Sequence, residues 1–349
     1  MTTGKTTGKT TGKTTPETTD PTPLLEVSGL AVDFRSAGAP VRAVRGIDFF
    51  LQPGESMAIL GESGSGKSVT GKALLGLLPA PAARVRGSIR FQGREVVGRA
   101  DRELRDLRGP GIGLVFQDAL DSLNPVFSVG SQLAEIFRVR LGWSRAAARA
   151  EAVRLLDQVG IPSPESRVDD YPDQFSGGMR QRVCIAMAIA LKPKLLVADE
   201  PTTALDVTVQ AGILSLLNRL RAETGMALLF VTHDLNVARL VADRVTVMYA
   251  GRIVEHGPIE QVYAQPAHPY TKALLASHPA AATHWSQLRP IGGNPPDKAG
   301  VPPGCAFHPR CPIAQDRCAA EIPDLREVAA GRRSACHFAL EVTDAAARA

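Results

Sequence analysis

The sequence predicts an α/β fold that begins with antiparallel strands, and three observations predict it. Brief apolar runs at residues 112–116, 194–199, 227–232 and 245–249 alternate with helix-like stretches, as buried parallel strands do. A glycine-rich loop lies between the strand-like run SMAIL and a helix-like stretch. The composition is globular, with 44% hydrophobic and 21% charged residues, which excludes a wholly disordered, collagen-like or coiled-coil chain.

The first 23 residues are unlike the rest of the chain. Residues 2–13 repeat the unit TTGK three times, and the polar stretch TTPETTDPTP follows. Because such a segment cannot form an apolar core, we expect residues 1–23 to be a disordered tail. Its Gly-Lys-Thr triplets lack a preceding strand and a following apolar helix, so they predict no phosphate site.

The remaining elements follow in order from Leu24. Residues 24–34 and 41–51 alternate like two strands around the turn SAGAP. The helix-like stretches are VTGKALLGLL, SVGSQLAEIFRV, MRQRVCIAMAIAL and VTVQAGILSLLNRL. After Pro258, prolines crowd in, four cysteines appear and strand signals fade. We therefore expect a large domain at residues 24–258 and a small C-terminal extension at residues 259–349.

Charge and hydropathy exclude some classes of function. The net charge is +5, and three of the lysines lie in the tail, so the folded part is nearly neutral and nucleic acid is not expected as the main ligand. No apolar run approaches the ~18 residues that a membrane span needs. The N-terminus also lacks the apolar stretch of a secretory signal. We expect a protein that stays in the cytoplasm, where its five cysteines are reduced or bind metal.

The first motif with chemical meaning is GESGSGKS at residues 61–68, which fits G-x-x-x-x-G-K-[ST] between a strand and a helix. Its glycines let successive backbone N–H groups turn inward around phosphate oxygens, where the dipole of the following helix favours negative charge. Lys67 would reach the β and γ phosphates, and Ser68 would offer its hydroxyl to Mg²⁺. The motif therefore predicts a nucleotide site.

The second motif, KLLVADE, ends an apolar strand in two carboxylates. The strand places them at its carboxyl edge, where α/β sheets bind ligands. Asp199 would hold Mg²⁺ through water, whereas Glu200 would orient or deprotonate the water that attacks the γ-phosphate. An acidic pair could instead cap the next element, but its combination with the phosphate loop favours catalysis.

The third motif, FSGGMRQR at residues 175–182, resembles the signature of ABC ATPases. The other motifs of that family occur in the same order. Gln117 matches the Q-loop, Asp206 the D-loop and His233 the switch histidine. Phe34 lies where such cassettes place an aromatic ring under adenine, although Phe49 and Phe50 are nearby alternatives. Six ordered motifs make chance coincidence far less probable than for any one of them.

The resemblance implies a fold and a set of site residues. The fold would be an ABC-type P-loop ATPase cassette, with a RecA-like core sheet, an antiparallel β subdomain and a helical subdomain that carries the signature. Glu200, His233 and Gln117 would be catalytic, and Mg²⁺ would be held through Ser68, Gln117 and Asp199. The ATP-binding residues would be Phe34, Gly61, Glu62, Ser63, Gly64, Ser65, Gly66, Lys67, Ser68 and Val69. The signature residues, facing ATP of a second cassette, would be Ser176, Gly177, Gly178 and Gln181.

In ABC ATPases two cassettes pair head to tail, so that the phosphate loop of one closes ATP against the signature of the other. The resemblance therefore implies a second ABC ATPase subunit, either another copy of this chain or a paralogue. Hydrolysis removes the ATP bridge and can drive opening and closing of the pair.

More particular motifs look like those of ATPase subunits of oligopeptide and dipeptide importers. They are FQDALDSLNP, YPDQFSGGMRQR, AHPYTKALL and PPGCAFHPRCP. The implied partners are two transmembrane permease subunits, which we expect to contact residues 118–127 and 170–175, and an extracytoplasmic solute-binding protein. The chain would then lie peripherally on the cytoplasmic face of the cell membrane. It departs from the family in Asp173 and Gln174, which replace the usual His-Glu pair, and in the Thr/Lys tail.

Four cysteines in the C-terminal extension have the spacing C-x5-C-x6-C-x17-C. They are Cys305, Cys311, Cys318 and Cys336. Four thiolates suit an iron–sulfur cluster or zinc, although the paired C-x2–4-C spacing usual for zinc is absent. The resembling family can hold a [4Fe-4S] cluster here, so we expect that cluster, with zinc and metal-free thiols as alternatives. Cys184, in an apolar helical pattern, is expected to pack in the core.

Three alternatives to peptide import remain from the sequence. Similar ATPases serve importers of nickel or other small solutes. A non-transport ABC ATPase acting on ribosomes or DNA is disfavoured, because those proteins usually join two cassettes or insert long coiled arms. A structural metal-binding protein with an inactive cassette is disfavoured, because Lys67, Asp199, Glu200 and His233 are all present.

Overall fold

The computed structural model describes residue 1 and residues 22–36, 39–117, 122–203, 205–277, 290–297 and 300–342. The tail predicted at residues 1–23 lies almost entirely outside this part. The first four residues of the segment expected to meet the permease, 118–121, also lie outside it. Along the described residues no helix is both long and apolar enough to cross a membrane.

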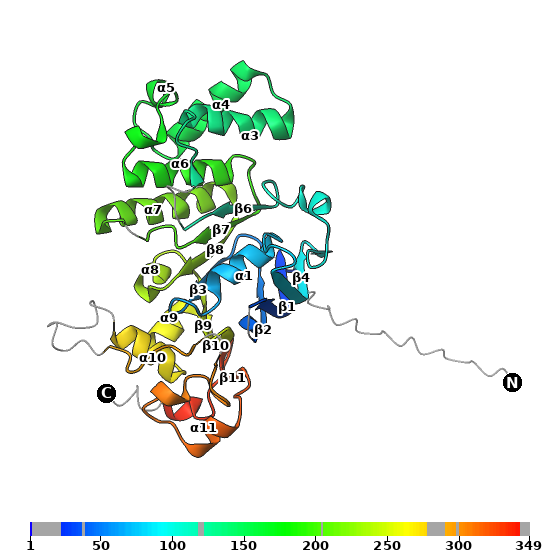
Figure 1. The fold of residues 1–349 in the computed structure, drawn as a ribbon, viewed down its shortest axis with the longest axis vertical. Helices are drawn as coiled ribbons and strands as arrows, with labels where there is room; N and C mark the ends of the chain where they lie inside the picture. The colour runs from blue at the N-terminus through cyan, green and yellow to red at the C-terminus, as the bar shows by residue number, and fades with distance from the viewer. Residues whose placement is uncertain are drawn as a thin grey trace.

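A mixed sheet crosses the middle of the molecule (Figure 1). Strands β3 and β8 pair in parallel with Ser56 opposite Leu228, and β7 pairs in parallel with β8 and β6. Every residue of β3, β7 and β8 is buried, because helices or the second sheet cover both faces. In sheet order the strands are β11 (Arg326–Ala329), β12 (Arg332–Ser334), β10 (Arg252–Pro258), β9 (Arg244–Tyr249), β3 (Ser56–Leu60), β8 (Ala227–Thr232), β7 (Leu195–Asp199) and β6 (Ile112–Val115).

A second, antiparallel sheet packs beside α1 (Lys67–Leu74). Its strands in spatial order are β2 (Val41–Leu51), β1 (Leu25–Phe34), β4 (Ala83–Phe91) and β5 (Arg94–Glu95). Apolar side chains of β1, β2 and β4 share one core cluster with β3, β7, β8 and α1. The predicted antiparallel strands at residues 24–34 and 41–51 are thus confirmed to within one residue.

Helices pack against the large sheet and against one another (Figure 1). A helical group at one end of the molecule contains α3 (Val129–Leu141), α4 (Arg145–Gln158), α5 (Pro164–Arg167) and α6 (Gly177–Ile189). These helices, α5 excepted, share a core with α7 (Val207–Thr224) and β6 to β8. The remaining helices are α8 (Leu235–Arg239), α9 (Ile259–Ala264), α10 (Pro269–Ala276) and α11 (Asp316–Ala320). The 3₁₀ helices include Asp101–Leu104, Pro172–Gln174 and His308–Arg310.

The start of two helices is set by capping side chains near the expected site. The Ser176 hydroxyl accepts a hydrogen bond from Met179 N at 3.3 Å and begins α6. The Asp206 carboxylate accepts one from Val209 N at 2.9 Å and begins α7. Such caps satisfy backbone N–H groups that have no partner within the helix. The expectation that strand signals fade after Pro258 holds only in part, because β12 pairs with β10 and extends the large sheet.

Candidate functional site

The carboxyl ends of β3, β7 and β8 converge on one cavity of about 1050 Å³. The phosphate loop follows β3, Glu200 follows β7 and His233 follows β8. Parallel strands bring their carboxyl ends to the same sheet edge, which explains why residues that follow three different strands meet here. Predicted site residues among those that line the cavity are Phe34, Glu62, Ser63, Gly64, Gly66, Lys67, Ser68, Val69, Gln117, Glu200 and His233.

The phosphate loop has a backbone that its glycines permit. Gly66 has φ of 105°, and a Cβ atom there would lie 2.5 Å from the Ala43 carbonyl oxygen. A Cβ atom at Gly61 would lie 2.3 Å from the Met248 carbonyl oxygen. Side chains at either position would displace the backbone of a neighbouring strand, so the loop requires glycine at both.

Lys67 is held inside this loop. Its side chain is 4% exposed, and its Nζ donates to the carbonyl oxygens of Gly61 at 2.7 Å and Glu62 at 3.1 Å. The same Nζ lies 3.6 Å from Glu200 Oε1. Burial lowers the pKa of Lys67, while the Glu200 and Asp199 carboxylates oppose that shift. The ammonium group is therefore pre-oriented at the floor of the cavity.

Ser68 and Asp199 form the second feature of the site. Ser68 Oγ donates to Asp199 Oδ1 at 2.9 Å, and Asp199 is buried. Burial raises the pKa of Asp199, and the Ser68 hydrogen bond opposes the rise. Hard divalent cations prefer oxygen ligands, and a hydroxyl, a carboxylate and the Gln117 amide supply them at this edge. These residues fit a magnesium ion.

Glu200 is the centre of a polar network. Its Oε2 accepts from Thr203 Oγ1 at 3.0 Å and from Gln117 Nε2 at 3.4 Å, and it lies 3.3 Å from His233 Nδ1. The His233 hydrogen bond, with Lys67 and Thr203, lowers the pKa of Glu200 to about 2 against the effect of burial. The carboxylate is thus ionised and oriented.

The backbone of Glu200 is also unusual. Its φ is 46°, a left-handed value that costs a non-glycine residue on the order of 1 kcal/mol. Its N–H donates to the Val231 carbonyl oxygen at 2.9 Å, so the neighbouring strand holds the strained turn in place. Strain of this kind directs the side chain back over the sheet edge toward Lys67 and His233.

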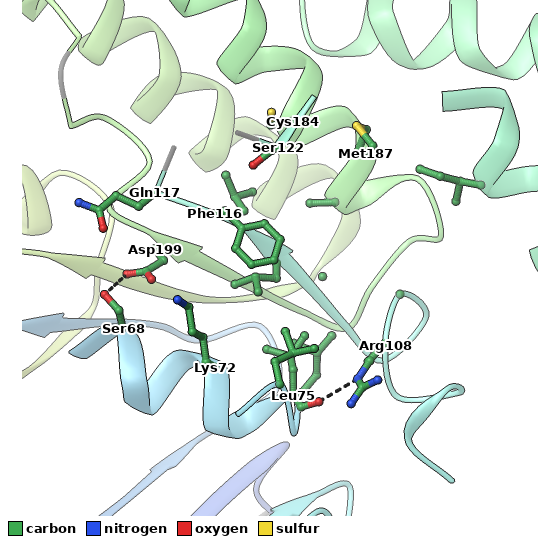
Figure 2. Close-up of a pocket in the computed structure, with 18 residues that line it drawn as sticks. Ser68, Lys72, Leu75, Arg108, Phe116, Gln117, Ser122, Cys184, Met187 and Asp199 are labelled. Atoms are coloured by element: carbon green, nitrogen blue, oxygen red, sulfur yellow. Dashed lines mark hydrogen bonds between the residues drawn. The ribbon is translucent and has the colours of Figure 1, made fainter. Parts of the chain in front are cut away.

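A second cavity, of about 730 Å³, shares Ser68 and Gln117 with the first (Figure 2). The ring of Phe116, Met187 of α6 and Lys72 of α1 line it. Figure 2 also shows the Ser68–Asp199 hydrogen bond among the residues that line it. Cys184 lies at its edge and is buried in the apolar core, as its sequence context predicts.

The signature residues do not line the nucleotide cavity of their own chain. Ser176 and Gly177 are exposed at the N-terminus of α6, and Gly178 and Gln181 are buried. Asp206, expected in the D-loop, is exposed at the start of α7. An exposed helix N-terminus presents backbone N–H groups and a positive dipole end outward.

Two family models match separate parts of this chain. A profile described as "ABC transporter" matches residues 44–203, and one described as "Oligopeptide/dipeptide transporter, C-terminal region" matches residues 254–318. The Escherichia coli dipeptide transport ATP-binding protein DppD is 47% identical over 318 residues, which cover 91% of this chain and 97% of DppD. The chain belongs to the ABC transporter ATP-binding proteins of the oligopeptide/dipeptide type.

Other members of this family differ in length. The oligopeptide transport ATP-binding protein OppD of Bacillus subtilis is 51% identical over 288 residues, covering 82% of this chain and 80% of OppD. OppD of Mycobacterium tuberculosis is 52% identical over 319 residues, covering 90% of this chain. The chain spans only 52% of the length of that relative.

Solved ABC structures share the fold. A dimeric, post-hydrolysis structure of the ATP-binding cassette MJ0796 bound to ADP and Pi has a TM-score of 0.60 and 28% identity, covering 67% of this chain and 98% of that one. The cbiO1 subunit of a Clostridium perfringens ABC transporter complex has a TM-score of 0.59 and 30% identity, covering 69% of this chain and 91% of that one. The expected ABC cassette fold is confirmed.

Sequence reasoning missed the part of the cavity that the family's C-terminal region forms. Its residues on the cavity wall are Leu274, Ser277, Pro290, Ile291 and Pro295. Thr203, which donates to Glu200, was also missed. Leu274 lies in the motif AHPYTKALL, which does not point to the cavity, and no motif contains the other four wall residues. Thr203 follows the DE pair by three positions and could have been considered as its partner.

The four cysteines of the extension line one small cavity together with Phe307, His308 and His337. The N–H of Cys305 donates to the Cys318 carbonyl oxygen at 2.8 Å, which joins two of the cysteine segments. Burial raises the pKa of Cys305 and Cys311, and that of Cys336 to about 11, so these thiols are protonated. Metal ligands are thiolates, and no three His, Cys, Asp or Glu side chains in the described ranges form a group that could hold a metal ion. The structure therefore gives the expected iron–sulfur ligands no support as a preformed set.

Proposed function

We propose that the chain is the ATP-hydrolysing subunit of a membrane ABC importer, which couples binding and hydrolysis of MgATP to uptake of oligopeptides or dipeptides. One observation carries the ATPase part: Lys67, Ser68 and the Glu200–His233 pair line one cavity, and Ser68 bonds the buried Asp199 beside it. The choice of peptide rests on relatives that are named as oligopeptide and dipeptide transport proteins.

Binding of ATP begins with an exchange of partners at Lys67. The ammonium group, which now bonds two loop carbonyl oxygens and faces Glu200, would turn to the β and γ phosphates. Inward N–H groups of the loop would bind the remaining phosphate oxygens at the N-terminus of α1. The half-buried ring of Phe34 lines the same cavity and would stack on adenine.

Mg²⁺ would be held by Ser68, Asp199 and Gln117, and it would neutralise phosphate charge when bound. Asp199 is buried beside Ser68 and would act through water. Gln117 bonds Glu200 at 3.4 Å, so the Q-loop links the cation site to the catalytic carboxylate.

Hydrolysis would be carried by Glu200 and His233. Glu200 would accept a proton from the attacking water, and His233 would stabilise the charge that develops on the γ-phosphate. With a pKa of about 2, Glu200 is a weak base while Lys67 and His233 face it. Transfer of Lys67 to phosphate removes one of these cations, which raises the pKa of Glu200 toward a value useful for catalysis.

A second cassette is part of this proposal. The exposed N-terminus of α6, with Ser176 and Gly177, would close over ATP held by the partner. The Ser176 hydroxyl accepts from Met179 N and keeps its own proton to donate. If the partner is a second copy of this chain, the same Ser176 closes both ATP sites. If the partner is a paralogue, the equivalent group of that paralogue closes one of them.

The permease would dock beside the Gln117 cavity. Exposed apolar side chains lie on the described part of the Q-loop region and on the segments expected to contact the permease: Phe116, Val126, Phe127 and Tyr171. Their exposed fractions lie between 44% and 70%, which is unusual for aromatic and branched residues of a monomer surface. The chain would thereby be held at the cytoplasmic face of the membrane, and the solute-binding protein would reach it only through the permease.

We also propose that the four cysteines hold a [4Fe-4S] cluster, in a structural role. They line one small cavity together, but no three of them, as described, form a group that could hold a metal ion, so the cluster would require their segments to rearrange. Cys305, Cys311, Cys318 and Cys336 would supply one thiolate each, and binding would require loss of their protons. The cluster would tie the three segments that carry these cysteines to one another.

The test of the main proposal is copurification. Membranes containing tagged Glu200→Gln protein are solubilised, and associated proteins are identified by mass spectrometry, with Lys67→Ala as a control that should not trap ATP. Two polytopic subunits and a second cassette are the expected result. Recovery of only ribosomal or DNA-associated proteins would overturn the transport proposal.

A further inference from the structure

The C-terminal extension reaches the phosphate loop through one arginine. Arg310, which ends the 3₁₀ helix His308–Arg310, donates from Nη1 and Nη2 to the two carboxylate oxygens of Glu62, at 2.7 and 3.1 Å. The Arg310 side chain is 4% exposed, and that of Glu62 is 24% exposed. This is a bidentate ion pair across 248 positions of sequence, and the geometry is the strongest that an arginine and a carboxylate form.

Arg310 lies on a rigid base. Its guanidinium carbon is 5.9 Å from the ring centres of Tyr249 and Phe307, and its Nη1 donates to the Tyr249 hydroxyl at 3.2 Å. Tyr249, Tyr270 and Phe307 pack together with ring centres 4.6 to 5.4 Å apart. A guanidinium group held against aromatic rings in this way loses little conformational freedom when it binds a carboxylate. It can therefore fix the position of the Glu62 side chain.

The extension also holds the backbone of Glu62. The Glu62 N–H donates to the Tyr270 hydroxyl at 2.8 Å, and Tyr270 is fully buried in α10. On its other side, the Glu62 carbonyl oxygen accepts from Lys67 Nζ at 3.1 Å. Glu62 is therefore fixed at its side chain and at its N–H by the extension, and it contacts the lysine of the phosphate loop directly.

Arg310 joins the two sides of the nucleotide cavity. Its Nε donates to the Gly292 carbonyl oxygen at 2.8 Å, and the neighbouring Pro290, Ile291 and Pro295 line the same cavity as the loop. One side chain thus sets the distance between the phosphate loop and a wall that belongs to the extension.

The Arg310–Glu62 ion pair affects how a negatively charged ligand can bind in the cavity. Glu62 lines a cavity that must accept a polyanion, and an unpaired carboxylate there would repel phosphate. Resting on the ATP site proposed above, we propose that Arg310 is a positioning residue of the ATPase: it neutralises and holds Glu62, and so makes the C-terminal extension a component of the nucleotide site.

Binding of a non-hydrolysable ATP analogue with Mg²⁺ to the full chain, measured by titration calorimetry, tests this role. Arg310→Met should weaken binding about tenfold, since it leaves Glu62 charged beside the phosphates. Removing that charge as well, in Arg310→Met with Glu62→Gln, should restore affinity to within about twofold of Glu62→Gln alone. A purely structural role for Arg310 would not produce this rescue.

Arg326→Met is the matched control, because Arg326 bonds the carbonyl oxygens of Cys336 and His337 inside the extension and does not line the cavity. It should bind the analogue as wild type does. Equal weakening by Arg326→Met, wild-type affinity in Arg310→Met, or absence of rescue in the double variant would each overturn the inference.

Folding of each variant is checked by circular dichroism. If Arg310→Met fails to fold, Arg310→Lys supplies the test, because lysine keeps the positive charge but cannot form the bidentate hydrogen bond. Affinity for the analogue should then fall about two- to fivefold. An unchanged affinity would contradict the role of the bidentate contact. If wild type itself binds no analogue, the proposed nucleotide site fails, which is a different result from failure of the Arg310 contact.

Discussion

His233 Nδ1 lies 3.3 Å from Glu200 Oε2, and the two residues follow adjacent parallel strands, β8 and β7. The sheet therefore creates the pair, since parallel pairing with Asp199 opposite Val231 brings the carboxyl ends of both strands to one edge. The contact raises the pKa of His233 and lowers that of Glu200 to about 2. Both shifts favour the charged pair near neutral pH.

This pair predicts a pH-dependent contribution to stability. The share from His233 is fully present below its unfolded pKa of 6.5 and is lost as pH rises through the raised folded pKa. The share from Glu200 is present above 4.5 and is lost as pH falls toward about 2. His233→Gln should therefore lower the melting temperature more at about pH 5.5 than at about pH 8.5. In a Glu200→Gln background the same substitution should show no such difference; persistence of the difference would refute the pairing.

Glu200→Gln should separate binding from hydrolysis. The amide keeps the size of the side chain but cannot accept a proton, so turnover in the full assembly should fall at least about 100-fold while ATP still binds. Steady-state phosphate release and nucleotide titration measure the two quantities. Thr203→Val, which removes one hydrogen bond to Glu200, is the control and should lose much less activity. Undiminished turnover in Glu200→Gln would remove this residue from the role of base.

Lys67→Ala should act on affinity first. It removes the buried ammonium group that faces the phosphates, and a loss of at least about tenfold in ATP affinity is expected. The matched control is Lys272→Ala, at an exposed position of α10, which should bind as wild type does. Calorimetric titration checks both variants, and an unchanged affinity in Lys67→Ala would contradict the phosphate-loop assignment.

A buried ion pair fastens the extension to the large sheet. Arg332 Nη2 lies 3.4 Å from Glu255 Oε1, and the two side chains are 6% and 1% exposed. Arg332→Met should destabilise the protein by about 3 kcal/mol, because it leaves a buried carboxylate without its cation. Urea unfolding measures the change. The neighbouring Arg333 is exposed, so Arg333→Met should cost little, and equal losses at the two positions would contradict the role of the pair.

Metal analysis tests the cysteine proposal. Protein purified without oxygen should contain about four iron atoms per chain, and Cys318→Ser should lose them. Cys184→Ser, in the apolar core of the cassette, should keep the iron. Zinc in place of iron would change the identity of the metal, whereas absence of both metals would eliminate the site.

The cassette could be predicted from the sequence because its signals are local. Five-residue apolar runs such as β3 and β7 are wholly buried, and the glycine loop between β3 and α1 has a pattern that few other structures share. The positions of Glu200 and His233 follow from the ends of such strands. The motifs therefore predicted the polar side chains that line the cavity.

The extension could not be predicted in the same way, because its contacts are distant in sequence. β11 and β12 are four and three residues long and rich in arginine, which gives them no strand pattern. Arg310 meets Glu62 only because the Tyr249, Tyr270 and Phe307 rings place it there. Neither residue carries a motif that points to the other.

The pairing of β12 with β10 protects the edge of the large sheet. Without β12, strand β10 would present a row of unsatisfied backbone groups next to four buried positions, and such an edge is a template for intermolecular aggregation. The hairpin of β11 and β12 covers this edge and ends the sheet on a short strand that carries the exposed, charged Arg326 and Glu327. This hairpin thus protects the cassette from aggregation through its sheet edge, and a cassette cut after Pro258 is expected to precipitate although its ATP motifs are intact.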